Sequence, residues 1–381
     1  MPHAGEEIII TPTELVAGGA ALARVDGFPI FALNVFPGDV ARVRLFEVKK
    51  GFARAELVEL VTPSPWRRAA PCPIANECGG CDWTALRLDK QLEAKRRILS
   101  ESLRRVGKIN EHPPIALHPS PLNYRLRSRL HRDGDAIGFY AMRSNRVVPL
   151  SEECEVVGVL TADVIPSVSE GPGWEGGTTR SPRSLADARD DIWELDGQLI
   201  TEGELAINGY RLSTDAFFQV NRHLLDTMQR LVTAHAERVR NRDTAIDLYA
   251  GVGFFSAPLA KRFERVIAVE GSPVSARYAR MNIPSNATVI EAPVERQAPK
   301  LPDADFVFLD PPRAGTRREV IDAIAKKTRE GIAWLSCDPV TFARDASRLI
   351  ASGWRLSTLD LLDLFPNTHH VETLSSFERE T

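Results

Sequence analysis

The sequence has 381 residues, of which 43% are hydrophobic and 26% are charged, and its formal net charge is -3. This length favours two or three domains, and the composition is that of an ordinary soluble globular protein. The chain contains no apolar run of membrane-spanning length, and its start, MPHAGEEIII, lacks the basic and apolar segments of a signal peptide. We therefore expect a cytoplasmic monomer without a membrane partner.

The first part of the chain has a β-strand pattern. Residues 6–62 contain short apolar runs such as FPIFAL and DVARVRLFEV, which Gly, Pro and Asp residues separate. Short strands at this spacing are typical of a small closed sheet. The pattern predicts an all-β barrel of the OB type over residues 1–63.

The next part, residues 64–205, has the mixed pattern of an α+β domain. It contains an amphipathic helix near 85–107 and β-like runs over 124–158, before a loop rich in Gly, Ser and Pro. Residues 61–150 hold sixteen Lys and Arg against eight Asp and Glu, and residues 151–240 reverse these numbers. The stretch NYRLRSRLHRDG indicates either a phosphate-binding surface or a solvated strand face.

Four of the five cysteines are candidate metal ligands. Cys72, Cys78 and Cys81 lie within ten residues of one another, and Cys154 is the next cysteine along the chain. An odd number of cysteines without a secretion signal argues against a disulfide framework. Four thiolates fit either a zinc ion or an iron–sulfur cluster. Because the spacing is not the paired Cys-x2-Cys of a zinc ribbon, we expect an iron–sulfur cluster.

Strands and helices alternate through residues 206–381. TAIDLYA, RVIAVE, DFVFLD and GIAWLSC have the pattern of buried strands, and the first three precede helical segments. This alternation predicts a doubly wound, Rossmann-like α/β domain with a parallel sheet. The active residues of such sheets lie at the carboxyl ends of the strands. Asp247, Glu270, Asp310 and Cys337 all stand at or just past such ends.

The segment DLYAGVGFF has the pattern of a ligand-binding turn between a strand and a helix. Gly251 and Gly253 allow a ligand to approach the backbone closely, and Glu270 at the next strand end can accept hydrogen bonds from ribose hydroxyls. This combination fits both NAD and S-adenosylmethionine. Ser256 follows GVGFF, so the third glycine of the dinucleotide fingerprint is missing.

Two later segments can supply reactive groups to the same edge of the sheet. In DFVFLDPPRAG a strand ends in Asp310, and two prolines then stiffen the loop. Cys337 follows another strand and can be either a small buried apolar residue or a nucleophile. In THHVETL, Glu372 can act as the base that the chemistry of a nucleophilic thiol requires.

Taken together, these motifs resemble the uracil-5 RNA methyltransferase family over nearly the whole chain. GGAALARVDGFPIFALNVFPGDVARVRL is similar to its amino-terminal TRAM barrel, and CPIANECGGC with Cys154 is similar to its iron–sulfur motif. DAFFQVN, DLYAGVGFFS, AVEGS, LDPPRAG, SCDPVTFARD and HHVE follow in the order of the family's catalytic blocks. The resemblance implies a class I fold with S-adenosylmethionine as methyl donor and a [4Fe-4S] cluster.

The resemblance also implies residue roles. Cys337 corresponds to the nucleophile and Glu372 to the proton acceptor. The residues that correspond to the S-adenosylmethionine site are Gln219, Tyr249, Gly251, Phe254, Glu270 and Asp310. RNA is the implied partner, with 23S ribosomal RNA first and transfer RNA second. The sequence departs from the family in SCDP for SCNP, in Ala250 for a frequent cysteine, and in a short segment between Cys154 and Gln219.

Three other functions fit parts of the pattern. An amino-methyltransferase also uses an acid-Pro-Pro loop but needs no thiol. An iron–sulfur RNA-binding protein could retain an inactive methyltransferase fold. A dehydrogenase fits least, because the third glycine is absent.

Overall fold

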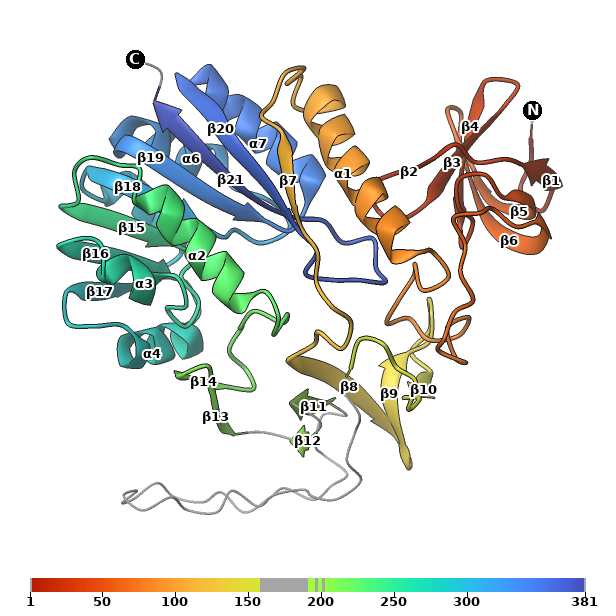
Figure 1. The fold of residues 1–381 in the computed structure, drawn as a ribbon, viewed down its shortest axis with the longest axis horizontal. Coiled ribbons are helices and arrows are strands. Elements are labelled where there is room, and N and C mark those ends of the chain that lie inside the picture. The colour runs from red at the N-terminus through yellow and green to blue at the C-terminus, as the bar shows by residue number, and fades with distance from the viewer. Residues whose placement is uncertain (1, 158–190, 196–197, 201–202, 380–381) are drawn as a thin grey trace.

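The computed structural model describes residues 2–157, 191–195, 198–200 and 203–379 (Figure 1). The loop predicted from SVSEGPGWEGGTTRSPRS lies outside these residues. Six strands form the amino-terminal sheet: β1 (Glu7–Ile10), β2 (Glu14–Leu15), β3 (Ala21–Val25), β4 (Phe28–Leu33), β5 (Val40–Val48) and β6 (Ala53–Thr62). Their order is β1-β5-β6-β4-β3-β2, and only β4 and β6 pair in parallel.

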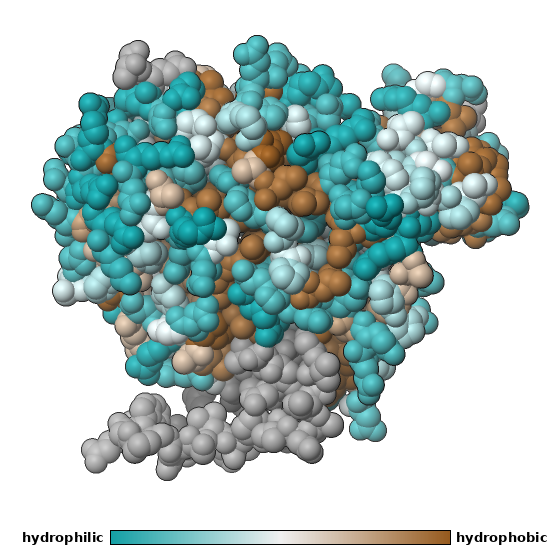
Figure 2. Space-filling view, in the orientation of Figure 1, coloured by the Kyte–Doolittle hydropathy of each residue, from teal (hydrophilic) through white to brown (hydrophobic). Residues whose placement is uncertain are grey.

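The amino-terminal sheet has an apolar interior and a mixed surface. Ala21, Val43 and Leu45 are fully buried, whereas Ile9 and Val61 are about half exposed. Hydrophobic residues therefore appear among hydrophilic ones on the surface of this sheet (Figure 2). Alternation of this kind is what strands with one buried face require.

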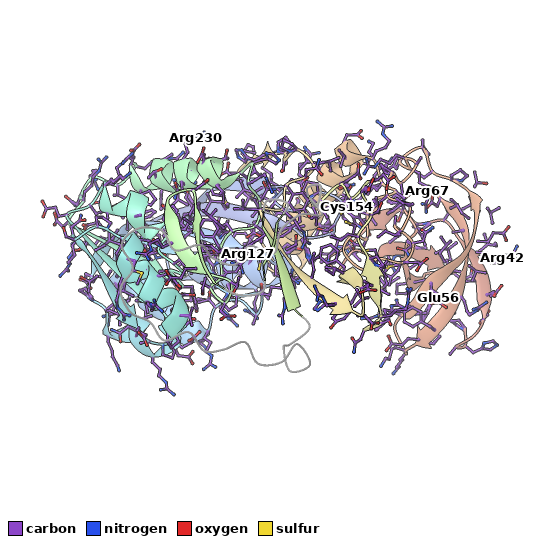
Figure 3. All side chains as sticks on the ribbon, turned by 90° about the horizontal axis from the view of Figure 1, so that it is seen from below. Arg42, Glu56, Arg67, Arg127, Cys154 and Arg230 are labelled. Carbon is purple, nitrogen blue, oxygen red and sulfur yellow. The ribbon has the colours of Figure 1, made fainter. Side chains whose placement is uncertain are left out.

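The middle of the chain supplies one long helix and two small sheets. Helix α1 spans Leu88–Arg105, close to the predicted helix. A five-stranded sheet contains β8 (Arg127–Asp133), β9 (Ala136–Tyr140), β10 (Val147–Pro149), β11 (Asp191–Leu195) and β12 (Gln198–Ile200). Strands β13 (Glu204–Ile207) and β14 (Tyr210–Ser213) form a separate hairpin. Cys154 and Arg127 lie in this middle part, between the amino-terminal sheet and the large sheet (Figure 3).

The large sheet has eight strands in the order β17-β16-β15-β18-β19-β21-β20-β7. Its members are β7 (Ile115–His118), β15 (Thr244–Leu248), β16 (Arg265–Glu270), β17 (Ala287–Glu291), β18 (Ala304–Leu309), β19 (Thr328–Ser336), β20 (Trp354–Leu362) and β21 (Glu372–Arg379). Strands β15 to β19 are parallel, as predicted. Strand β21 is antiparallel to both of its neighbours, β19 and β20, which the sequence analysis did not anticipate.

Helices cover both faces of this sheet. They are α2 (Leu225–Ala236), α3 (Ser256–Ala260), α4 (Pro273–Asn282), α5 (Val294–Gln297), α6 (Arg318–Lys327) and α7 (Pro339–Ala351), with a 3-10 turn at Ala298–Lys300. Ile246 and Trp334 pack on the face that carries α1, α5, α6 and α7. Phe306 and Phe308 pack on the face that carries α2, α3 and α4. Because both faces are covered, the central strands read as continuous apolar runs.

Helix α1 is joined to the large sheet by a buried ion pair. Lys95 is fully buried, and its Nζ lies 2.6 Å from Oδ1 of Asp363 and 2.9 Å from the carbonyl oxygen of Phe365. Both partners belong to the loop that follows β20. No helix in the described part of the chain is long and apolar enough to cross a membrane.

Candidate active site

The predicted strand-end residues lie along one edge of the large sheet. Asp247 is the next-to-last residue of β15, and Glu270 is the last residue of β16. Asp310 directly follows β18, and Cys337 directly follows β19. Parallel pairing of these four strands brings their carboxyl ends to the same edge. The prediction of a shared edge is therefore confirmed for these residues.

Glu372 reaches this edge because β21 runs antiparallel to β19. Leu335 faces Leu374 and Ser336 faces Thr373 in the strand register. Strand β19 ends at Ser336, and Cys337 follows it directly, while Glu372 is the first residue of β21. The carboxyl group of Glu372 is close enough to raise the pKa of the Cys337 thiol. The pairing of β19 with β21 thus brings the thiol and the carboxyl group near each other.

The environment of this pair disfavours charge. Burial raises the pKa of Cys337 to about 12, and the carboxyl groups of Glu372 and Asp310 add to this effect. Burial and Asp310 also raise the pKa of Glu372 well above its ordinary value. The guanidinium of Arg313 lowers the pKa of both groups. Three acidic groups, Cys337, Glu372 and Asp310, are therefore buried close together. The guanidinium of Arg313 favours the charged forms of Cys337 and Glu372.

Replacing Asp310 and replacing Arg313 should shift the pKa of the Cys337 thiol, and therefore its rate of alkylation, in opposite directions. At pH 8.5 the Asp310→Asn variant should be alkylated at Cys337 faster than the wild type, because loss of a negative charge lowers the thiol pKa. The Arg313→Gln variant should react more slowly. Each unit of pKa changes the thiolate fraction about tenfold. Mass spectrometry of the Cys337 peptide after iodoacetamide treatment measures both rates, and equal rates in the two variants would contradict this electrostatic account.

A second group of predicted residues lines one pocket beside this pair. The pocket is formed by Phe217, Phe218, Gln219, Tyr249, Ala250, Gly251, Val252, Phe254, Phe255 and Asp310. It therefore includes five of the six residues expected to bind the methyl donor. The sixth, Glu270, accepts a hydrogen bond of 2.8 Å from the backbone N–H of Gly251.

The turn over this pocket has an unusual backbone. Gly251 has a φ of 56°, and the neighbouring Tyr249 has a φ of 63°, a left-handed conformation that is uncommon outside glycine. The Tyr249 hydroxyl donates to Glu295 over 3.2 Å. Strained backbone of this kind is often found at ligand sites, where the surrounding structure holds it in place.

Asp310 is fixed within the pocket by a side-chain amide. Nε2 of Gln219 donates to Oδ2 of Asp310 over 3.1 Å. Burial raises the pKa of Asp310 to about 7, and this hydrogen bond opposes the shift. Near neutral pH the carboxyl group can therefore exist in either protonation state.

Sequence reasoning missed some contributors to this edge. Asp247 stood out only by its position, yet it is fully buried, its Oδ2 accepts from Ser256, and its Oδ1 has no hydrogen-bond partner among the described residues. Burial raises the pKa of Asp247 to about 7. Arg313 was noted only as a neighbour of the prolines, and the structure places its guanidinium 3.3 Å from the ring of His370. The charge of a residue in a loop does not indicate which strand end it will face.

Two sequence features have structural explanations. Asp338, which replaces the family's usual asparagine, caps α7 by accepting from the N–H groups of Val340 and Thr341. Asparagine and aspartate cap helices about equally well, so this departure preserves the turn. Arg127 is only 8% exposed and donates to the carbonyl oxygens of Thr214 and Ala216. Arg127, one of the arginines in the stretch NYRLRSRLHRDG, is therefore engaged within the protein, and neither a phosphate contact nor a solvated strand face describes it.

The four other cysteines line a separate cavity. It is bounded by Cys72, Ile74, Ala75, Cys78, Gly80, Cys81, Thr84, Phe139, Leu150, Cys154, Glu155, Val156 and Asn367. Burial raises the pKa of Cys72 and Cys78, and it raises that of Cys81 to about 12. All five cysteines are free. Within the described residues, no three His, Cys, Asp or Glu side chains are grouped as around a single metal ion.

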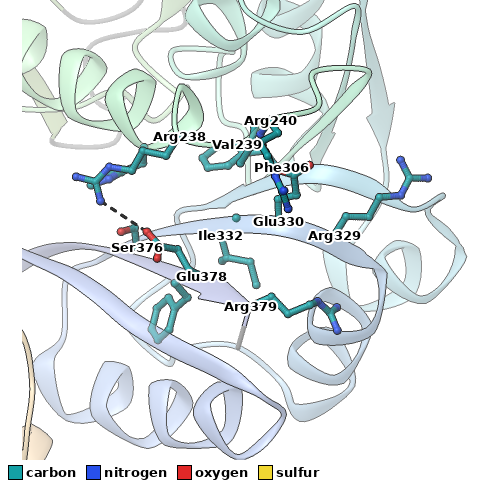
Figure 4. Close-up of a pocket in the computed structure, with 13 residues that line it drawn as sticks. Arg238, Val239, Arg240, Phe306, Arg329, Glu330, Ile332, Ser376, Glu378 and Arg379 are labelled. Atoms are coloured by element: carbon teal, nitrogen blue, oxygen red, sulfur yellow. Dashed lines mark hydrogen bonds and ion pairs between the residues drawn. The ribbon is translucent and has the colours of Figure 1, made fainter. Parts of the chain in front are cut away.

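Another pocket lies at the opposite edge of the large sheet, between the end of α2 and strands β19 and β21 (Figure 4). Four arginines contribute to its lining, but their charges have partners within the protein. Arg329 bonds Asp305, Arg238 lies 3.9 Å from Glu378, and Arg379 donates to two backbone carbonyls. This pocket lies where β19 begins and β21 ends, at the opposite ends of these strands from Cys337 and Glu372.

Comparisons with known proteins show the family to which the chain is similar. The profile of the family described as tRNA (Uracil-5-)-methyltransferase matches residues 188–292 and 300–379. A Gloeobacter violaceus protein described as an RNA methyltransferase is 30% identical over 98% of this chain and 97% of its own length. An Aquifex aeolicus protein with the same description is also 30% identical, over 97% of this chain and 98% of its own.

A solved structure shares the overall fold. The tRNA (uracil-54, C5)-methyltransferase of Pyrococcus abyssi, described in complex with S-adenosyl-L-homocysteine, has a TM-score of 0.66. It is 22% identical, and the match covers 97% of this chain and 99% of the other. Fold and relatives define an RNA methyltransferase with an α/β catalytic sheet. The chain belongs to the RNA (uracil-5-)-methyltransferase family, which confirms the resemblance found in its motifs.

Proposed function

We propose that this enzyme methylates carbon 5 of a specific uridine in RNA, with S-adenosylmethionine as the methyl donor. The observation that carries the proposal is the proximity of Cys337, Glu372 and Asp310 where β19 ends and β21 begins, since the Glu372 and Asp310 carboxyl groups both raise the pKa of the Cys337 thiol. Carbon 5 of uracil is a weak nucleophile, so a thiolate that adds to the electron-poor carbon 6 and a carboxylate that removes the proton from carbon 5 would together allow its methylation.

The pocket beside the pair suits the methyl donor. The Gly251 turn leaves its backbone accessible, and Phe254 contributes an aromatic wall. The Glu270 carboxylate accepts from the N–H groups of Gly251 and Ser272 and keeps lone pairs for ribose hydroxyls. We assign Gln219, Tyr249, Gly251, Phe254, Glu270 and Asp310 to this site. The description of the Pyrococcus abyssi enzyme as a complex with S-adenosyl-L-homocysteine supports the assignment.

We assign the nucleophile's role to Cys337 and the proton acceptor's role to Glu372. Sγ of Cys337 adds to carbon 6 of the uracil, and the ring electrons move toward carbon 5 and O4. Carbon 5 then takes the methyl group that the bound sulfonium donor supplies. The carboxylate of Glu372 removes the proton from carbon 5, and the bond between Sγ and carbon 6 breaks as the ring double bond re-forms. Covalent addition thus divides one difficult step into easier ones.

The burial of Cys337 and Glu372, which raises the pKa of both groups, suits this sequence of steps. A carboxylate whose pKa lies well above its ordinary value is a stronger base once it has lost its proton. Arg313 lowers the pKa of both reactive groups and would help each of them to ionise. The target base must leave its stack to reach this edge, so an accessible loop of the RNA is the expected substrate.

We propose 23S ribosomal RNA as the substrate, since the amino-terminal and cysteine motifs together are typical of enzymes that act on it. Transfer RNA is the second candidate, because the similar Pyrococcus abyssi enzyme is described as acting on it. Mapping 5-methyluridine in both RNAs from the source organism, with and without the gene, tests the proposal. One ribosomal uridine should lose its methyl group, whereas a loss confined to transfer RNA would select the alternative. Unchanged methylation in both RNAs would argue for an inactive RNA-binding protein.

We propose that Cys72, Cys78, Cys81 and Cys154 hold a [4Fe-4S] cluster. The four thiols line one cavity with apolar walls, and four thiolates are the usual ligand set. Methyl transfer needs no electron transfer, so the cluster would connect the two cysteine-bearing segments. Protein purified without oxygen should contain iron and sulfide and absorb visible light. Stoichiometric zinc without visible absorbance would overturn this assignment.

We propose that the chain is divided into three domains, each with its own role in the reaction. Residues 1–63 form the TRAM barrel, residues 64–205 form the cluster-bearing domain with an RNA-binding surface, and residues 206–381 form the catalytic domain. We expect the enzyme to work as a monomer in the cytoplasm, where its RNA substrates are made.

A further inference from the structure

The loop between β20 and β21 carries one fully buried polar residue, Asn367. Its φ is 66°, a left-handed conformation that asparagine tolerates better than most residues. The loop leads directly into Glu372, the proposed proton acceptor. Asn367 therefore lies in the same loop, shortly before the residue that bears this carboxyl group.

The side chain of Asn367 contacts three segments that are distant in sequence. Its Nδ2 donates to Oε2 of Glu155 over 2.9 Å. Its Oδ1 accepts from the guanidinium of Arg68 and from Nε2 of Gln91, each over 3.0 Å. Gln91 in α1 also accepts from the backbone N–H of Asn367 over 2.7 Å. One amide thus connects three earlier segments of the chain to the loop between β20 and β21.

These contacts lead to both cysteine-bearing segments. Glu155 directly follows Cys154, and the Asn367 carbonyl oxygen accepts from the N–H groups of Asp82 and Trp83, which directly follow Cys81. The Asp82 carboxylate also accepts from the backbone N–H of His369 and contacts its ring Nδ1. The cysteine cavity and the loop that precedes Glu372 are therefore one hydrogen-bonded unit.

We propose that Asn367 is a positioning residue for uracil methylation, which ties both sides of the cysteine cavity to the loop that sets the place of Glu372. This inference rests on the proposed role of Glu372 as the proton acceptor. A displacement of about 1 Å at a reacting group can reduce a rate about a hundredfold. Changes around the cysteines would therefore reach the chemistry through Asn367, although the cavity itself does not contain the reactive pair.

The Asn367→Asp variant tests this arrangement in the full-length protein. Aspartate also tolerates the left-handed backbone, but it places an acceptor against the Glu155 carboxylate where the amide donated. Hydrogen exchange at the backbone amides of residues 363–371 should become at least about tenfold faster. With RNA tritiated at carbon 5 of the target uridine, tritium release should slow by about tenfold or more, while KM for S-adenosylmethionine stays unchanged.

A second substitution and a control make the result specific. Adding Glu155→Gln to Asn367→Asp restores a donor between the two positions, so exchange and tritium release should return toward wild-type values. The control is Asn286→Asp, because that amide donates only to backbone carbonyls of residues 260–264, on the far side of the sheet. It should leave both measurements for the 363–371 loop unchanged.

The outcomes separate this inference from the proposed function. Wild-type exchange and wild-type tritium release in Asn367→Asp would overturn the inference, even if the enzyme methylates uridine. Failure of the double variant to recover either measurement would overturn it as well. If wild-type protein methylates no RNA, the proposed function fails, and the exchange measurement still decides whether Asn367 holds the loop.

Discussion

The Cys337→Ala variant should lose methylation completely while it still binds S-adenosylmethionine with nearly wild-type affinity. Without Sγ no bond to carbon 6 can form, and carbon 5 of uracil is too weak a nucleophile to take the methyl group unaided. Cys337 is also absent from the residues that line the pocket proposed for the cofactor. Radiolabelled methyl transfer to RNA and calorimetric titration of the cofactor measure the two properties.

The Glu372→Gln variant should separate the steps that Cys337→Ala abolishes together. The thiol can still attack and the methyl group can still be transferred, but the proton on carbon 5 has no acceptor. Protein joined covalently to methylated RNA should accumulate and survive denaturing electrophoresis, while tritium at carbon 5 is retained. RNA with 5-fluorouridine at the target should trap the wild-type enzyme in the same way, because fluorine cannot leave as a cation.

Two results would contradict this division of labour. Normal turnover in Glu372→Gln would mean that another group removes the proton, and Asp310 would be the first candidate. An adduct formed by Cys337→Ala would mean that another residue attacks the ring. The variant that lacks both groups should form no adduct.

The Lys95→Met variant should be destabilised by about 3–5 kcal/mol, because it leaves the Asp363 carboxylate buried without its partner. Burial lowers the pKa of Lys95, and the Asp363 carboxylate opposes this shift, so the pair depends on both partners. Unfolding in urea, followed by circular dichroism, gives the change in the free energy of unfolding.

A surface lysine of the same helix serves as the control. Lys90 pairs with Glu93, and both side chains are partly exposed, so Lys90→Met should cost only about 1 kcal/mol or less. Adding Asp363→Leu to Lys95→Met removes the unpaired charge and should recover part of the lost stability. Equal stability of the two single variants would show that the buried pair contributes little.

The parallel part of the sheet was predictable because its strands are buried on both faces. Such strands appear as unbroken apolar runs, so the positions of Glu270, Asp310 and Cys337 at strand ends follow from the sequence. Strand β7 has only four residues, and IALH has no pattern that distinguishes a strand from a loop. Its pairing with β20 depends on contacts made far along the chain.

The candidate site was predictable only in part, for a related reason. Spacing could not place Glu372 near Cys337, since that depends on the antiparallel insertion of β21 between β19 and β20. The resemblance to the family supplied the pair instead. Asn367 gave no signal at all, because its partners at positions 68, 91 and 155 are brought together only by the folded structure.

The insertion of β21 also constrains how the protein is made. Strands β19 and β20 are synthesised before β21, yet in the finished sheet each pairs with β21 and not with the other. Until β21 emerges from the ribosome, both strands have an unpaired edge, which is the kind of surface that favours aggregation. Cys337, the proposed nucleophile, is likewise synthesised before Glu372, its proposed base. The pairing of β21 is thus the event that brings these two residues together.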